Sequence, residues 1–118
     1  MKSAALILAT LALAATSEAG RITGTCYIQV VNPHDFVKMD CKATLPDGSR
    51  REGYKTEYAH FLKTCAKDGS ICWQINSKVP QNVDIFYANT VRQVTGTVSD
   101  HSETPHVSSW RNTYSVDF

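Results

Sequence analysis

Hydrophobic and polar residues alternate along two neighbouring segments, residues 22–31 and residues 36–45. The tetrad between them, Asn32-Pro33-His34-Asp35, combines residues typical of a type I turn, with proline at the second position. Because the period-two alternation of both segments agrees in register, the pattern predicts a half-buried antiparallel hairpin. One face of this hairpin collects only apolar, small or cysteine side chains. Its opposed pairs are Ile22 with Leu45, Gly24 with Ala43, Cys26 with Cys41, Ile28 with Met39, and Val30 with Val37.

The other face of the predicted hairpin is largely polar, but it carries two aromatic side chains, Tyr27 and Phe36. Aromatic residues are unusual on a solvated face, and they are enriched among the residues that dominate the binding energy of protein interfaces. Tyr27 and Phe36 are therefore the candidate protein-binding residues. The alternative is that a second layer covers them, formed by the C-terminal segment with Trp110 or Tyr114.

The segment from residue 53 to residue 67 places apolar residues at helical spacing, and Asp68-Gly69 follows it as a typical helix end. This pattern predicts one amphipathic helix. A strand is the alternative, because aromatic residues also favour β structure. The residues that recur at i, i+4, i+7, i+8 and i+11 are Tyr54, Tyr58, Phe61, Leu62 and Cys65.

Further strands are predicted at residues 71–75, 83–87, 91–99 and 110–118, with a polar loop at residues 100–109. This order of elements predicts an α+β fold, in which a small antiparallel β-sheet packs on one helix. An all-β sandwich is the alternative if the helix is absent.

The first nineteen residues have the features of an export signal. Lys2 precedes an apolar stretch at residues 4–15, and Ser17-Glu18-Ala19 offers small residues for cleavage before Gly20. The stretch is shorter than the ~20 residues that span a bilayer. We therefore expect residues 20–118 to form a single secreted domain, with no membrane partner.

All four cysteines lie in the predicted secreted domain, and an even number in a short exported chain predicts two disulfides. Cys26 and Cys41 face each other in the predicted hairpin and are one possible pair. Bridges from the hairpin to Cys65 and Cys72 are favoured, because they close longer loops. The choice between the two crossed connectivities stays open. Zinc is not expected, because no closely spaced cysteine pair occurs.

The net charge of +1 gives no electrostatic reason to expect nucleic acid as the main partner. The best enzymatic hypothesis is a secreted ribonuclease, which needs a general base, a general acid and a cation for the phosphate. No catalytic motif surrounds the candidate residues, so we expect neither an enzyme nor a cofactor. The candidates for those roles are His60, Glu103, His106 and Arg92.

The leader MKSAALILATLALAATSEA, the early cysteine in GTCYIQVV and the small two-bridge domain resemble the small secreted effector proteins of filamentous plant-pathogenic fungi. The resemblance implies a non-enzymatic protein that binds a host protein or a fellow effector protein. It also implies roles in virulence and in suppressing plant defence, recognition as an avirulence factor, and delivery into host cells. The alternatives are a ribonuclease-like or RNA-binding protein and a small toxin or inhibitor.

Overall fold

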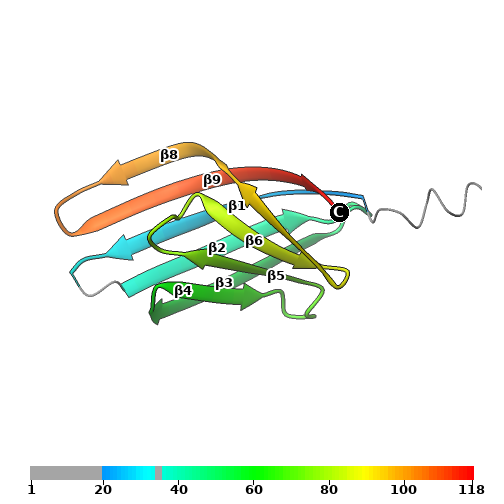
Figure 1. The fold of residues 1–118 in the computed structure, drawn as a ribbon, viewed down its shortest axis with the longest axis horizontal. Coiled ribbons are helices and arrows are strands. Elements are labelled where there is room, and N and C mark those ends of the chain that lie inside the picture. The colour runs from blue at the N-terminus through cyan, green and yellow to red at the C-terminus, as the bar shows by residue number, and fades with distance from the viewer. Residues whose placement is uncertain (1–19, 34–35) are drawn as a thin grey trace, which may run out of the picture.

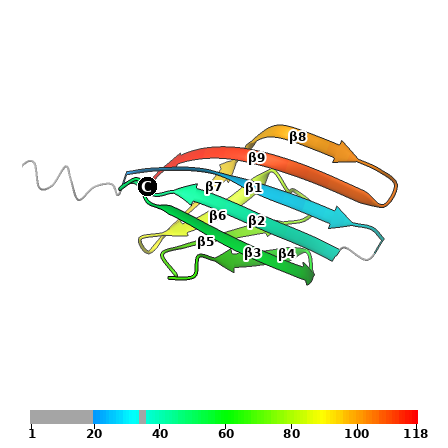
Figure 2. The same cartoon turned by 180° about the vertical axis from the view of Figure 1, so that it is seen from behind.

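The computed structural model describes residues 20–33 and 36–118, and every helix or strand in these ranges is a β-strand. The strands form two antiparallel sheets that pack face to face (Figures 1 and 2). The predicted α+β fold is therefore wrong, and the all-β sandwich fits. The predicted export signal and the residues His34-Asp35 of the predicted turn lie outside the described residues. The strands are β1 (Arg21–Val31), β2 (Phe36–Thr44), β3 (Arg50–Tyr58), β4 (Phe61–Cys65), β5 (Ile71–Asn76), β6 (Asn82–Tyr87), β7 (Thr90–Thr95), β8 (Thr97–Glu103) and β9 (Val107–Asp117).

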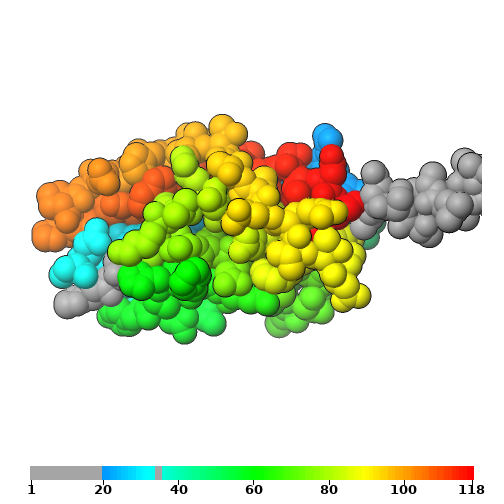
Figure 3. Space-filling model, viewed as in Figure 1, coloured from blue at the N-terminus to red at the C-terminus, as the bar shows by residue number. Residues whose placement is uncertain are grey.

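One sheet has five strands in the order β3-β2-β1-β9-β8, and the other has four in the order β4-β5-β6-β7. Alternate residues of the central strands point into the space between the sheets, as in other β-sandwiches. On β5, for example, Ile71, Trp73 and Ile75 are at most 1% exposed. The β8–β9 hairpin and the end of β1 extend past the four-stranded sheet (Figures 1 and 3). The solvent side of the five-stranded sheet is called the outer face below.

The predicted hairpin is confirmed together with its register. β1 and β2 pair antiparallel, and Cys26 lies opposite Cys41 while Ile28 lies opposite Met39. All of the predicted inward-facing apolar side chains are buried, with exposed fractions of 6% or less. They form the side of the hydrophobic core that the five-stranded sheet contributes, and the four-stranded sheet packs against them. These side chains are Ile22, Cys26, Ile28, Val30, Val37, Met39, Cys41, Ala43 and Leu45.

The helix predicted over residues 53–67 is wrong. This segment forms the second half of β3 and all of β4, with a short bend at Ala59-His60 between them. The helical pattern placed Tyr54, Tyr58 and Phe61 on a buried face, whereas the structure exposes them by 63%, 69% and 62%. These three aromatic side chains therefore lie on the exposed surface of strands and do not form the buried face of a helix.

The buried positions of this segment are Gly53 of β3, Leu62 and Thr64 of β4, and Ala66 directly after β4. Gly53 packs so closely on Trp73 that an added Cβ would lie 2.9 Å from the indole ring. Because the one buried position in β3 has no side chain, the alternation that marks a strand is absent from the sequence there. The strand alternative that aromatic residues favour is the correct one.

The strands predicted at residues 71–75, 83–87 and 110–118 are confirmed. The segment at residues 91–99 is not one strand, because the chain leaves the four-stranded sheet after β7 and joins the five-stranded sheet as β8. Gly96 lies at this crossing, where an added Cβ would lie 2.8 Å from the Cβ of Asn112. The predicted loop at residues 100–109 is also wrong, since most of it belongs to β8 and β9.

All four cysteines form disulfides, as expected, but the favoured pairing is wrong. Cys26 bonds to Cys41 across β1 and β2, and Cys65 bonds to Cys72 across β4 and β5. Each bridge joins directly opposed residues within one sheet, and neither connects the hairpin to the later pair. Two disulfides are consistent with an extracellular or secreted protein.

A chain of buried hydrogen bonds connects the two sheets. The indole Nε1 of Trp73 donates to the Tyr114 hydroxyl at 2.7 Å, and this hydroxyl donates to the carbonyl oxygen of Lys42 at 2.9 Å. Burial of the phenol raises the pKa of Tyr114 to about 12. β1 contributes Gly24 at this point, where an added Cβ would lie 2.6 Å from the hydroxyl oxygen. The glycine therefore makes room for the hydrogen-bonded tyrosine.

The two ends of the sandwich domain lie side by side. The amide of Phe118 donates to the carbonyl of Gly20 at 2.9 Å, and Arg21 forms an ion pair of 2.8 Å with Asp117. Both contacts lie at the opposite end of β1 from Val31, about 33 Å away along the strand.

Candidate protein-docking face

The register of the five-stranded sheet gathers four apolar side chains into one row on the outer face. Phe36 lies opposite Tyr58 on one side and opposite Val31 on the other, and Val31 lies opposite Val107. We call Tyr58, Phe36, Val31 and Val107 the apolar row. Because neighbouring strands are about 4.8 Å apart, the row is about 14 Å long. It runs across β3, β2, β1 and β9 near the hairpin tips.

The side chains of the apolar row differ in exposure. Tyr58 is 69% exposed, while Phe36, Val31 and Val107 are half-buried. The rings of Phe36 and Tyr58 pack with their centroids 4.6 Å apart at an angle of 52°. Such a tilted pair stabilises the position of both rings. The row therefore presents a preformed apolar ridge to solvent.

The backbone behind the apolar row is held by a contact between the two hairpin tips. The amide of Asn32 donates to the carbonyl of His106 at 2.7 Å, next to the β1–β9 pair that contains Val31 and Val107. Thr104 closes the β8–β9 tip through hydrogen bonds with Val107. These bonds fix the end of the sheet where the row lies.

Tyr27 lies on the same outer face, four residues along β1 from Val31 of the apolar row, or about 13 Å. It is flanked by Asp40 of β2 and Arg111 of β9. The guanidinium of Arg111 lies 5.2 Å from the centroid of the Tyr27 ring, a cation–π distance. Tyr54 continues this row on β3, opposite Asp40.

The C-terminal segment does not cover Tyr27 and Phe36. Trp110 and Tyr114 belong to β9, and the register places them opposite Ile28 and Gly24 on the inner side of the sheet. Tyr27 and Phe36 are half-buried because neighbours on their own face, Arg111 and Tyr58, pack against them. Both predicted residues therefore remain on an open surface.

The sequence pattern placed Val31 on the same hairpin face as Tyr27 and Phe36, but it did not reveal Tyr58 and Val107 as members of the apolar row. Tyr58 was assigned to a helix, and Val107 was assigned to a loop. A period-two reading of Tyr54, Thr56 and Tyr58 predicts that these three side chains share one strand face, which the structure bears out. Nothing in the local sequence pairs Val107 with Val31, because the contact joins β1 to the last strand.

The four ribonuclease candidates do not converge. Arg92 belongs to the four-stranded sheet, where its guanidinium lies 6.0 Å from the centroid of the Phe118 ring. His60 lies two residues after Tyr58, and His106 lies directly before Val107. Tyr58 and Val107 are three strand spacings, or about 14 Å, apart, so the two histidines lie at separate places on the sheet. Glu103 accepts a long hydrogen bond of 3.5 Å from Ser108. Within residues 20–33 and 36–118, no cluster of His, Cys, Asp and Glu suited to a metal ion occurs.

The chain belongs to the class of small disulfide-bonded β-sandwiches with an open, partly aromatic sheet face. Comparison with protein families, with curated proteins and with solved structures finds no match. The part of the chain that the structure describes contains no helix long and apolar enough to cross a membrane.

Proposed function

We propose that this chain is an exported, non-enzymatic binding protein that docks onto another protein through the apolar row, with Tyr27 of the same sheet face as a further contact. The observation that carries the proposal is the alignment of Tyr58, Phe36, Val31 and Val107 across four strands of an uncovered sheet face. The resemblance to fungal secreted effectors supports a host protein or a fellow effector protein as the partner. It also supports roles in virulence and in suppression of plant defence.

The chemistry of the face is typical of a protein interface. Tyrosine, phenylalanine and arginine are enriched at the centre of interfaces, and tyrosine and arginine are frequent energetic hot spots. Here two aromatic rings and Tyr27 with its stacked Arg111 lie on one surface. Lys38, Gln29 and Ser109 form a polar row that lies between the apolar row and Tyr27. A ridge of this kind fits a complementary groove on a partner.

The ribonuclease alternative has weaker support. Its four candidate residues lie on different sheets and at separate hairpin ends, so they do not form one site around a scissile phosphate. The protein-binding proposal needs only the surface that the register creates.

Site-specific photocrosslinking tests the proposal. The oxidised domain, residues 20–118, carries a photoreactive benzophenone amino acid at position 58 and is mixed with leaf apoplastic fluid or leaf cell extract. We expect a discrete adduct that excess unlabelled wild-type protein competes away. Because a hot-spot side chain contributes about 2 kcal/mol, Phe36→Ala should compete about thirtyfold less well.

The matched control uses the opposite sheet. Val91 of β7 is 51% exposed on the outer side of the four-stranded sheet, so Val91→Ala should compete like wild type. Equal competition by Phe36→Ala and Val91→Ala, with both variants folded, contradicts the proposed docking face. A second variant carries the photoreactive amino acid at position 91 in place of position 58. A discrete adduct from this variant, with none from the variant labelled at position 58, contradicts the proposed docking face as well.

A further inference from the structure

The part of the outer face nearer the chain ends is polar and hollowed rather than ridged. Two depressions of about 490 Å³ each share Glu52 in their lining: one lies over β1, β2 and β3, and the other lies at the edge of β3, where Cys65 and Lys67 also line it. One is lined by Lys42, Thr44 and Arg50 among others, and the other by Asp40 and Tyr54. We call these two neighbouring depressions together the β2–β3 groove.

Tyr54 lines this groove and leans along β3 away from Glu52, toward Thr56. The Thr56 hydroxyl donates to the Tyr54 hydroxyl at 2.8 Å, and both residues face outward from β3. A tyrosine that reaches the side chain two residues further along its own strand has to lean along the sheet surface. The ring is 63% exposed, so one of its faces is presented to solvent. This geometry suits stacking against a flat ligand more than insertion into a pocket.

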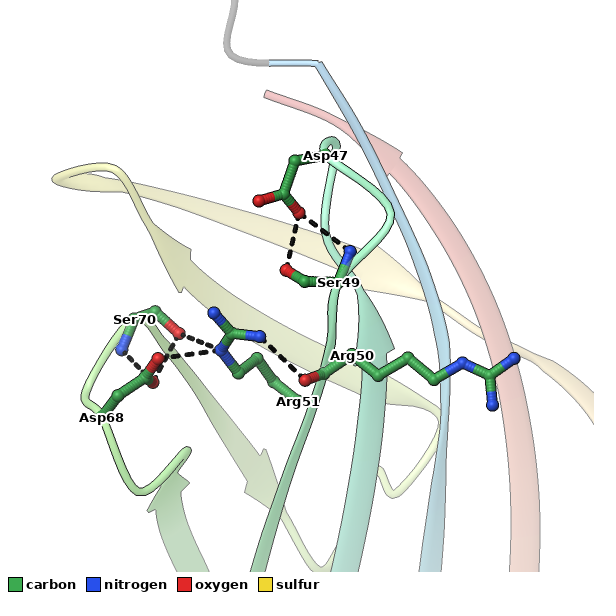
Figure 4. A network of polar contacts seen from close by, with 6 residues as sticks. All are labelled: Asp47, Ser49, Arg50, Arg51, Asp68 and Ser70. Atoms are coloured by element: carbon green, nitrogen blue, oxygen red, sulfur yellow. Dashed lines mark hydrogen bonds and ion pairs between the residues drawn. The ribbon is translucent and has the colours of Figure 1, made fainter.

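The charges of the groove alternate in sign. Arg51 points away from Arg50 and is neutralised by Asp68 at 2.9 Å (Figure 4). Hydrogen bonds from Ser70, reinforced by Arg51, lower the pKa of Asp68 to about 2. The charged groups left to line the groove are Arg50, Lys42, Glu52, Asp40 and Lys67.

We propose that the β2–β3 groove binds an uncharged oligosaccharide chain, stacked on Tyr54. A sugar ring has a face of C–H bonds, which the negatively polarised face of an aromatic ring attracts. Its hydroxyl groups both donate and accept hydrogen bonds, which matches carboxylates alternating with ammonium and guanidinium groups. The alternating signs give a polyanion no continuous positive track.

This site is separate from the apolar row. Tyr58 is four residues further along β3 and about 13 Å from Tyr54, so the two aromatic residues test different proposals. Loss of glycan binding leaves the protein-docking proposal standing, and the reverse also holds.

Sedimentation with insoluble polysaccharides tests the inference. The oxidised domain is mixed with chitin, cellulose, xylan or β-1,3-glucan, and titration calorimetry then measures binding of the matching hexasaccharide. We expect at least one uncharged polymer to deplete the protein from solution. Tyr54→Ala should weaken binding at least tenfold, Tyr54→Trp should retain it, and Tyr58→Ala should bind like wild type. Unchanged thermal unfolding shows that each variant is folded.

Three outcomes overturn the inference. The first is that none of the four uncharged polysaccharides depletes the wild-type protein. The second is that Tyr54→Ala and Tyr58→Ala bind equally well. The third is that only polygalacturonate binds and that moderate salt abolishes this binding, since such behaviour indicates attraction of a polyanion to the cations of the groove.

Discussion

A single hydroxyl group connects three strands in the core. Tyr114 accepts from the Trp73 indole and donates to the Lys42 carbonyl, and its side chain is 3% exposed. Removing it leaves a buried donor and a buried acceptor without their partner. Since each unpaired buried group costs about 1–3 kcal/mol, we expect Tyr114→Phe to lower the free energy of unfolding by about 2–4 kcal/mol. Denaturant unfolding measures this loss.

Tyr54→Phe is the matched control, because that hydroxyl is on the surface and bonds only to Thr56. Surface substitutions of this kind change stability by less than about 0.5 kcal/mol. A similar loss of stability in both variants would contradict the buried hydrogen-bond chain.

The same tyrosine makes stability depend on alkaline pH. Its pKa is about 12 in the folded protein, against about 10 in an unfolded chain. The unfolded state therefore releases this proton first, so the free energy of unfolding falls as the pH rises from about 10 to about 12. We expect the wild type to lose about 2–3 kcal/mol more than Tyr114→Phe across this window. Parallel pH profiles of the two proteins would contradict the prediction.

At the scale of elements, the β6–β7 turn contains one unfavourable residue, Ala88. Ala88 and Asn89 have φ angles of 51° and 60°, as in the type I′ turn that favours Asn-Gly. Alanine in a left-handed conformation costs about 1–2 kcal/mol. The double substitution Ala88→Asn with Asn89→Gly should therefore raise the free energy of unfolding by about 1 kcal/mol. Urea unfolding curves check this increase, and a lowered midpoint contradicts the assigned turn.

A strand could be predicted from the sequence where its own residues alternate between apolar and polar side chains. The β1–β2 hairpin was predictable, because both strands alternate and the turn between them is short. β3 was not, because its one buried residue is Gly53 and the bend at Ala59-His60 contains neither glycine nor proline. The crossing at Gly96 was missed because the Val/Thr pattern of residues 91–99 continues through it.

The candidate site was predictable only in part, for a related reason. Tyr27 and Phe36 lie on the outward side of a hairpin whose register the sequence determines. Tyr58 and Val107 join them through pairing with β2 and β1, which depends on the fold of the whole sheet. Long-range pairing of this kind leaves no local signal.

At the scale of the whole molecule, the two disulfides lie in different environments. Cys26 and Cys41 are fully buried between the sheets, whereas Cys65 is exposed and Cys72 half-buried. Thiol–disulfide exchange requires access of a thiolate to the sulfur. Mild treatment of the native protein with dithiothreitol should therefore reduce Cys65–Cys72 first.

Alkylation followed by peptide mass spectrometry identifies the first pair of thiols to appear. Under denaturing conditions burial no longer protects the inner bridge, so both bridges should be reduced at similar rates. Earlier alkylation of Cys26 and Cys41 in the native protein would contradict the packing described above.

The adjacency of Gly20 and Phe118 has a practical consequence for handling this molecule. An affinity tag, fluorophore or surface linker attached at the C-terminus, or before Gly20, is located at the opposite end of the five-stranded sheet from the apolar row. Immobilised through this end, the protein presents Tyr58 and Phe36 toward the bulk solution. A sensor surface prepared in this orientation keeps the ridge accessible to a candidate partner.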